Sequence, residues 1–235
     1  MSEFSHTLYP FFASLLFQVI FDSADRPLMF TKFHDSYLGR PNTGHAVELS
    51  NPAMEEYEVV RTTLLPGMLK TLSHKKSMPK KNGIKFFEIS DVVLKDDADD
   101  IGARNERRLA AAYAGLGAGF EVIHGLVDRI MTLNQVVKYN GGDDATKQLR
   151  YNIVPCEDPL VCGTFFPGRR ASIVMTKPGP PEWVTIGEFG VVHPDVLVSE
   201  KYDIDFPCSL LEMNIELLAG GLGSVSMFAA PFRST

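Results

Sequence analysis

The residues that could do chemistry in this sequence form a few small clusters, and the first is rich in glycine. Gly115, Gly117 and Gly119 lie between a predicted strand and a predicted helix, where dinucleotide-binding loops occur. The third glycine of that fingerprint would have to stand at Phe120, so a tight strand-to-helix turn explains the glycines equally well. The sequence also has no GxxxxGKS/T loop, GxSxG elbow or HExxH helix, which leaves P-loop, hydrolase and zincin chemistry without a motif.

Metal and thiol chemistry have little support. The acidic stretch Asp96–Asp100 could hold magnesium, but carboxylates in a polar loop are usually solvated. Cys156, Cys162 and Cys208 are odd in number and lack CxxC spacing, so no disulfide framework is indicated. We expect them to be small buried hydrophobic residues in a reducing compartment.

One basic patch stands out between Lys70 and Lys85, which contains six lysines and no acidic residue. Its lysines could contact a phosphate backbone as point charges. The patch lacks interleaved aromatic residues and arginines, so it does not indicate recognition of nucleic-acid bases. The alternative is that these lysines belong to a solvated helix end and loop. The predicted phosphate contacts are Lys75, Lys76, Lys80 and Lys81.

A further cluster is the segment Phe165–Arg170, where two aromatic residues lead into a Pro-Gly turn and two arginines. Such a turn can place a guanidinium beside an apolar cluster, where it binds an anion or a buried carboxylate. Residue chemistry alone does not choose between these two roles.

The elements that must position these clusters follow from apolar periodicity. Thr62 or Thr63 is expected to cap a helix that starts near Leu64, with Pro66 in its first turn. The pattern predicts a second helix over Phe120–Leu133, where His124 and Asp128 would form a surface hydrogen bond. Predicted strands are Tyr57–Arg61, Ile84–Leu94, Leu109–Tyr113, Ala171–Met175, Trp183–Val192 and Pro207–Leu218. The sum is an α+β fold, an antiparallel sheet flanked by helices.

Composition bounds the class of protein. The chain has 235 residues, 45% hydrophobic residues and a net charge of −6, which excludes disorder and a polytopic membrane protein. The apolar stretch Leu8–Phe21 is 14 residues long, shorter than the roughly 20 that cross a bilayer. We therefore expect a buried element there and a cytoplasmic protein. The predicted division of the chain is an N-terminal segment 1–45 that contains the apolar stretch, a core 46–218 and a C-terminal tail 219–235.

Six segments of the predicted core carry a joint signal: Leu49–Pro52, Arg61–Gly67, Phe87–Val92, Gly119–Leu126, Phe166–Arg169 and Gly190–Asp195. In this order and at these distances, they resemble the C-terminal core of the β subunit of phenylalanyl-tRNA synthetase of the eukaryotic and archaeal type. The resemblance covers about Val47 to Leu218, whereas residues 1–45 match poorly.

The resemblance implies a class II aminoacyl-tRNA synthetase-like core and a partner. In this family the α subunit carries amino-acid activation, and the assembly is an (αβ)2 heterotetramer that charges tRNA(Phe) with phenylalanine. ATP and Mg²⁺ would be bound mainly outside this chain, tRNA would be met through the complex, and no membrane is involved. The family's upstream modules, which include the editing site, are not visible here, so the chain resembles a fragment, a truncated gene model or a short paralogue.

The resemblance also implies that this chain is catalytically silent. Class II catalysis uses an arginine and, two residues later, an acid on a central strand, and here Glu88 and Ser90 stand in those places. The glycines and arginine of the GxGxxR signature are missing from Glu212–Leu217. The alternative is a stand-alone class II-like protein with a binding role and no ligase activity.

Fold or interface roles, and no catalytic, cofactor or metal role, are expected for a small set of residues. Arg169 in particular is expected to meet a buried carboxylate or a backbone group. The set is Arg61, Pro66, Glu88, Phe166, Gly168, Arg169, His193 and Pro194.

Overall fold

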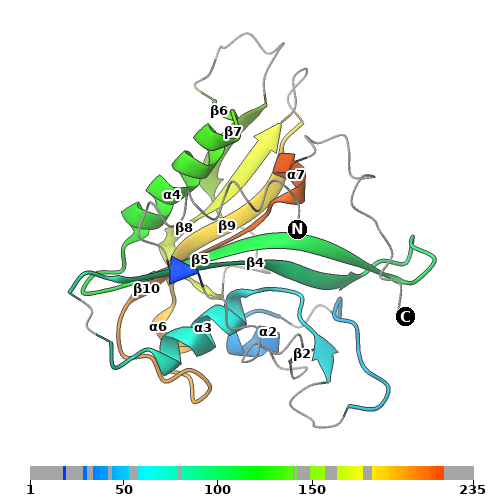
Figure 1. Ribbon diagram of the computed structural model, residues 1–235, viewed down its shortest axis with the longest axis horizontal. Helices are drawn as coiled ribbons and strands as arrows, with labels where there is room; N and C mark the ends of the chain where they lie inside the picture. The colour runs from blue at the N-terminus through cyan, green and yellow to red at the C-terminus, as the bar shows by residue number, and fades with distance from the viewer. Residues whose placement is uncertain are drawn as a thin grey trace.

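A single large sheet organises the computed structural model (Figure 1). The structure describes residues 18–19, 29–30, 34–41, 44–52, 58–78, 81–139, 141, 149–156, 163–176 and 182–219. The sheet has eight strands in the order β1-β4-β5-β10-β9-β8-β7-β6. All neighbouring pairs from β4 to β7 are antiparallel, whereas the two-residue edge strands β1 and β6 pair in parallel. The α+β class is therefore confirmed, and the sheet is mixed at its edges.

The elements have the following bounds. The strands of the large sheet are β1 Gln18–Val19, β4 Ile84–Lys95, β5 Ala103–Ala114, β6 Val137–Lys138, β7 Arg150–Pro155, β8 Phe165–Thr176, β9 Val184–Val192 and β10 Cys208–Asn214. A small antiparallel sheet joins β2 Met29–Phe30 to β3 Val59–Val60. The helices are α2 His34–Tyr37, α3 Leu65–His74, α4 Phe120–Leu133, α6 Pro194–Leu197 and α7 Glu216–Ala219.

Some of the predicted helices and strands agree with the structure in their bounds, and others differ from it. Helix α4 has its predicted bounds, and β4 extends only one residue beyond its predicted end. Strand β5 begins at Ala103 rather than Leu109, because its charged first half pairs residue by residue with β4. Strand β8 begins at Phe165, so the Pro-Gly motif lies inside the strand as an irregularity of its pairing with β9.

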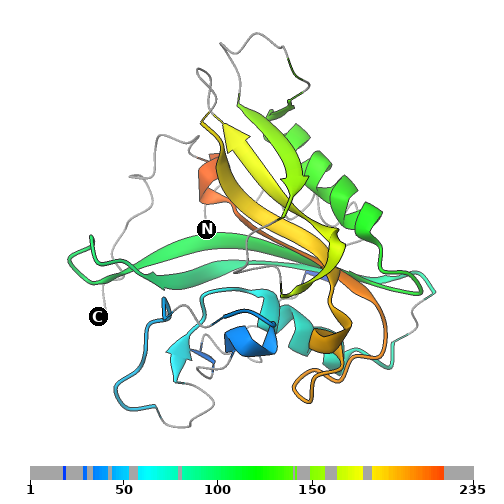
Figure 2. The ribbon, with the colours of Figure 1, turned by 180° about the vertical axis from the view of Figure 1, so that it is seen from behind.

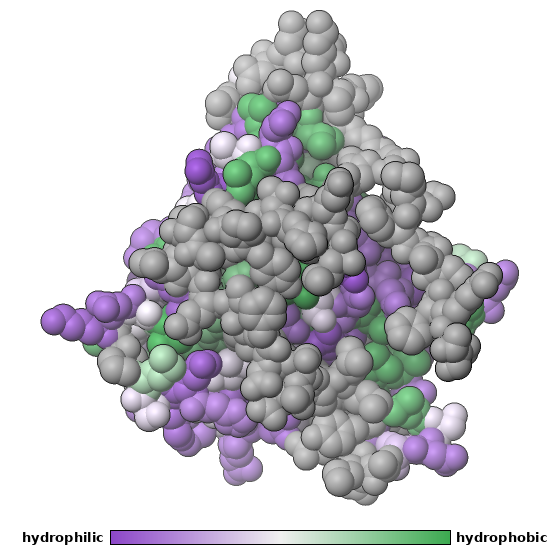
Figure 3. All heavy atoms as spheres, viewed as in Figure 1, coloured by the Kyte–Doolittle hydropathy of each residue, from purple (hydrophilic) through white to green (hydrophobic). Residues whose placement is uncertain are grey.

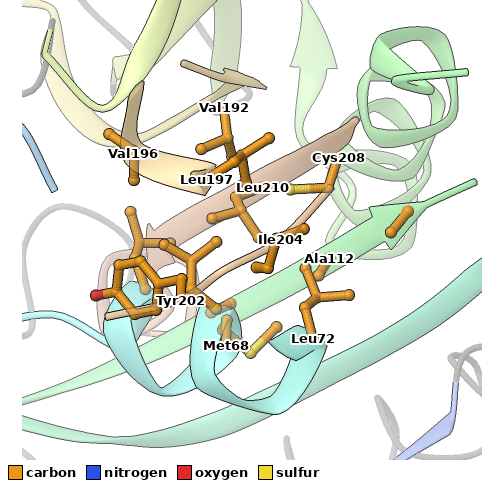
Figure 4. Close-up of a cluster of buried hydrophobic side chains, with 14 of the residues drawn as sticks. Met68, Leu72, Ala112, Val192, Val196, Leu197, Tyr202, Ile204, Cys208 and Leu210 are labelled. Carbon is orange, nitrogen blue, oxygen red and sulfur yellow. The ribbon is translucent and has the colours of Figure 1, made fainter. Parts of the chain in front are cut away.

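Helices cover both faces of the sheet. Helix α4 packs its apolar stripe on one face, against Phe87, Leu109 and Phe189. Helices α3 and α6 and the segment that follows α6 cover the other face (Figures 1 and 2). The second core cluster there joins Met68 and Leu72 of α3 to residues of the sheet, of α6 and of the segment that follows α6, including Ala112, Val192, Leu197, Tyr202, Ile204 and Leu210 (Figure 4).

Two of the three glycines after β5, Gly115 and Gly119, are explained by one aromatic ring. Gly119 has φ +67 and precedes the first turn of α4, and a Cβ there would lie 2.1 Å from Cδ1 of Tyr113. A Cβ at Gly115 would lie 2.9 Å from the Tyr113 hydroxyl, whereas one at Gly117 would meet nothing within 4 Å. The turn therefore needs glycine because Tyr113 packs over it, which accounts for the motif without a nucleotide.

The segment before residue 46 contributes to the core. Leu38 is fully buried in the second cluster, and Gly39 approaches Gly163 so closely that a Cβ on Gly163 would overlap the Gly39 carbonyl. The division at residue 45 stays a prediction, but residues on its N-terminal side pack on the sheet. Of the stretch Leu8–Phe21, only Gln18–Val19 lies within the described residues, beside β4.

Two other expectations can be compared with the structure. Cys156 and Cys208 are buried and unbridged, as predicted, while Cys162 lies outside the described residues. Among the helices of the described part, none combines the length and apolar character needed to cross a bilayer.

The packing of Tyr113 on glycine predicts a position-specific effect. Gly119→Ala should lower the free energy of unfolding by about 3 kcal/mol, since it adds left-handed backbone strain to a clash with a packed ring. Gly117→Ala, two residues away in open space, is the matched control and should change stability little. Urea denaturation compares the two, and equal midpoints would contradict this account of the turn.

Candidate functional site

Three glutamates form a transverse row on the sheet face that α3 covers. Glu88 on β4 and Glu212 on β10 both pair in register with Ala110 on β5, and Glu212 pairs directly with Glu188 on β9. We call Glu88, Glu212 and Glu188 the carboxylate row. It separates the second apolar cluster from a charged region toward the β10 C-terminus. Because like charges on adjacent strands repel, each carboxylate needs a compensating cation or donor.

Arg61 neutralises the first member of the row. Its Nη1 lies 3.2 Å from Oε1 of Glu88, its Nη2 donates to the Ser90 hydroxyl, and its Nε donates to the Asp91 carbonyl at 2.9 Å. Arg61 is 6% exposed, and burial lowers its pKa while Asp91 and Glu212 oppose that shift. The two positions that the resemblance aligns with the class II signature are thus bound to a guanidinium from this chain.

Glu212 caps helix α3. Its carboxylate accepts hydrogen bonds from the Leu64 backbone N–H at 2.7 Å and from the Thr63 hydroxyl at 2.5 Å, and it is 2% exposed. A carboxylate at a helix N-terminus also interacts favourably with the helix dipole. The predicted Thr cap is thus only part of the arrangement: Thr63 Oγ1 accepts from Leu65 N–H at 3.3 Å, but the residue at the cap position is Leu64. Pro66 is buried in the first turn, as expected.

Glu188 is held by the segment that follows α2. Arg40 donates from Nη2 to Glu188 Oε1 at 2.8 Å and from Nε to the Thr164 hydroxyl at 2.7 Å. Burial raises the pKa of Glu188, and Glu212 adds to this shift, whereas Arg40 and Arg108 oppose it. Arg40, which precedes the long strands of the sheet in the chain, therefore supplies the cation for the third carboxylate of the row.

A small charged cavity of about 270 Å³ lies beside the row. Arg108 bonds Glu106 at 2.7 Å and lies 3.6 Å from Glu212, and Arg104 bonds the other oxygen of Glu106 at 3.2 Å. Burial alone would lower the pKa of Arg108, but Glu212 and Glu106 raise it above its ordinary value. The cavity therefore holds alternating charges that compensate one another.

The Pro-Gly-Arg motif lies at the opposite end of the same sheet face. Gly168 has φ +75 in the irregular part of β8, and the side chain of Arg169 is exposed. Among the described residues, Arg169 shows neither of its two expected contacts, a buried carboxylate or a backbone group. Contacts of these kinds are made by other arginines: Arg170 donates to the Cys156 carbonyl at 2.9 Å, and Arg40 meets the buried Glu188. Arg169 therefore lies at the surface, beside the irregular part of β8.

His193 and Pro194 start helix α6. The Nδ1 of His193 accepts from the Asp195 backbone N–H at 3.2 Å, and Pro194 occupies the first helical position. The His193 ring also stacks on Phe166 at a centroid distance of 5.9 Å. These residues thus shape a helix start and an aromatic contact.

The predicted phosphate-contact lysines lie around the end of α3. Lys76 and Lys81 are exposed and Lys75 is partly buried, while Lys80 lies outside the described residues. Lys76 forms a 2.6 Å ion pair with Asp203, which raises the pKa of Lys76. Figure 3 shows hydrophilic residues over the lower left of the molecule, where α3 and α6 lie in Figure 1. The phosphate contact stays a prediction.

Metal-ligand geometry is not found in the described ranges, where no three His, Cys, Asp or Glu side chains could hold an ion. In the acidic loop, Asp96 and Asp99 accept hydrogen bonds from the backbone N–H groups of Ala98 and Ile101, within their own turn. On α4, the Nδ1 of His124 lies 3.5 Å from Asp128, which accepts a hydrogen bond from Tyr151.

Sequence reasoning missed four residues of the charged region. The charges at every second residue over Arg104–Arg108 are typical of a strand with one charged face. Glu188 could have been found as the acidic residue within an otherwise largely apolar strand. Arg40 had no such signal, because its partner lies 148 residues away along the chain. The missed residues are Arg40, Glu106, Arg108 and Glu188.

The burial of the Arg61–Glu88 pair predicts a large mutational effect. Arg61→Met should destabilise the protein by about 3–5 kcal/mol, because it leaves a buried carboxylate without its cation. Adding Glu88→Gln should restore part of that loss, since the neutral amide needs no counter-charge. Thermal and urea unfolding of the single and double variants measure this, and additive losses would contradict the pairing.

The raised pKa of Glu188 predicts a pH dependence with a definite sign. At a pH above 4.5, the ordinary pKa of a glutamate, the Glu188 carboxyl of the folded protein keeps its proton, whereas the same carboxyl in the unfolded chain has lost it. The resulting stability is present below that value and is lost as the pH rises through the higher folded pKa. The urea midpoint of the natural protein should therefore fall relative to that of Glu188→Gln as the pH rises from 4.5 to neutrality, and parallel curves would argue against it.

Comparisons with known proteins agree with the sequence resemblance. The profile of the phenylalanyl tRNA synthetase beta chain CLM domain family matches residues 27–215. The phenylalanine–tRNA ligase beta subunit of Caenorhabditis elegans is 43% identical over 182 residues, which cover 77% of this chain and 28% of that protein. The cytoplasmic beta subunit of Arabidopsis thaliana is 41% identical over 184 residues, with coverage of 77% and 28%.

The beta subunit of Homo sapiens is 45% identical over 170 residues, which cover 72% of this chain and 26% of that protein. The chain thus spans little more than a quarter of the length of these relatives. The matched range includes strands β4 to β10 of the large sheet and, with them, the carboxylate row. By this match and these identities, the chain belongs to the phenylalanyl-tRNA synthetase beta chain family.

Proposed function

We propose that this chain is a catalytically silent, class II synthetase-like core of phenylalanine–tRNA ligase that acts as a scaffold for the α subunit. The α subunit would activate phenylalanine with ATP and Mg²⁺ and charge tRNA(Phe), within an (αβ)2 assembly. The family membership and the identities with beta subunits support the ligase context. The naming of one relative as cytoplasmic supports a cytoplasmic location.

The observation that carries the silent role is the internal pairing of the carboxylate row. In a class II site, an open arginine would meet the ATP phosphates; here Arg61 is buried against Glu88, Ser90 and the Asp91 carbonyl. A triphosphate on this face would also meet Glu88, Glu212 and Glu188. Because anionic phosphates are repelled by carboxylates in a poorly solvated site, this face does not fit ATP.

Magnesium fits no better. A hard divalent cation needs several free oxygen ligands, and the Glu212 carboxylate accepts hydrogen bonds from Thr63 and Leu64 while Glu88 is bound to Arg61. A cation there would also be repelled by Arg61 and Arg108. We therefore assign ATP and Mg²⁺ to the partner subunit, and direct tRNA contact through the lysines after α3 remains part of the proposal.

Co-purification with the α subunit tests the scaffold role. We expect this chain to elute with a purified α subunit, and the isolated chain to give no ATP–pyrophosphate exchange above background. The full-length β subunit of a relative is the positive control for assembly. Failure of this chain to bind α would overturn the scaffold role, whereas exchange by the chain alone would favour a stand-alone class II-like enzyme.

A further inference from the structure

An apolar groove of about 470 Å³ lies at the end of the sheet face opposite the charged cavity. Strands β8 and β9, helix α6 and the segment that leads into β10 form its walls. Its volume lies in the range of surface hollows that take up ligand groups or partner side chains. The residues that shape it most are Phe166, Arg169, Leu197, Val198, Ile204 and Phe206.

The floor of the groove consists of core side chains. Val192, Leu197 and Ile204 are at most 5% exposed and belong to the second core cluster, where Figure 4 shows them together with Leu210 and Cys208. Because these side chains share a packed cluster with residues of α3 and β10, we infer that the hollow is preformed. A preformed concave surface costs little conformational entropy on binding.

Several apolar side chains at or near the rim of the groove are exposed to solvent and do not belong to the core. Phe166 is 41% exposed and Val198 is 67% exposed, and Leu116, two residues before the lining residue Ala118, is 82% exposed. Single exposed apolar residues are common on protein surfaces, but a cluster around an apolar hollow is typical of an interaction site. Phe166 is also held in place by its stack on His193.

The charge at the rim indicates the chemistry of the occupant. Arg169 lines the groove with an exposed side chain, and no carboxylate of the described residues lies within ion-pair distance of it. An exposed guanidinium beside an apolar hollow favours a carboxylate attached to an apolar body. The other charged lining residue, Asp205, lies beside the ion-paired Lys76 and contributes to its raised pKa.

We propose that this groove docks an apolar segment of the α subunit that carries an acidic residue, with its apolar side chains on Phe166, Val198 and Leu197 and its carboxylate on Arg169. The inference rests on the proposed scaffold function and names the surface that performs it. It also gives a role to the Phe165–Arg170 motif, in which Arg170 makes a backbone contact inside the chain and Arg169 is an exposed residue of the groove lining.

Affinity for the purified α subunit tests the groove. Val198→Asp should weaken binding by about tenfold or more, because it places a charge among apolar contacts. Arg169→Glu should weaken it by about tenfold and reduce its dependence on salt, because it removes the ion pair. Both positions are exposed, so the variants should unfold at the same temperature as the natural chain.

Two control variants make the same changes elsewhere. Ile101→Asp alters an equally exposed apolar residue at the tip of the β4–β5 hairpin, and Arg129→Glu reverses an exposed charge on α4, across the sheet. Both controls should bind α like the natural chain. If the natural chain fails to bind α, the proposed function is wrong; if it binds and the groove variants bind equally well, or no more weakly than the controls, the groove assignment is wrong.

Discussion

The structure depends on the neutralisation of three carboxylates that lie in one row across the sheet. Glu88, Glu212 and Glu188 are buried or nearly so, and two of them oppose each other on adjacent strands. Such an arrangement is stable only if each charge has a partner, because burying an isolated carboxylate costs more free energy than the net stability of a folded domain. The partners come from different places: Arg61 precedes α3, Arg40 follows α2, and both lie outside the large sheet.

This requirement connects the segments of the chain to one another. The Glu212 carboxylate holds the N-terminus of α3, so the helix that covers the second core cluster is oriented by a residue on the central strand β10. Arg40 similarly ties the α2 segment to β9. The same bonds that fix these elements also occupy the groups that a nucleotide would need, so the support of the fold and the proposed catalytic silence have one physical origin.

The sheet face thereby acquires two ends of different character. Toward the C-terminus of β10 the charges compensate one another around a small cavity, and toward its N-terminus an apolar groove opens, with the exposed Arg169 in its lining. The first end is electrostatically satisfied within the chain. The second presents apolar surface and an arginine that forms no ion pair with the described residues, which is the combination that association with another protein would cover.

The sequence by itself determined the elements with strong local patterns and the family. Helix α4 and strand β4 were predicted almost to the residue, because apolar spacing at 3.6 or 2 residues is a local property. Tertiary structure alone decided which arginine meets which carboxylate. Arg169 was expected to meet a buried carboxylate or a backbone group, and its side chain is exposed, whereas Arg40 binds Glu188, which lies 148 residues away along the chain. Charge pairing depends on strand order and register, and these arise only when distant segments are brought together, so no local pattern in the sequence encodes them.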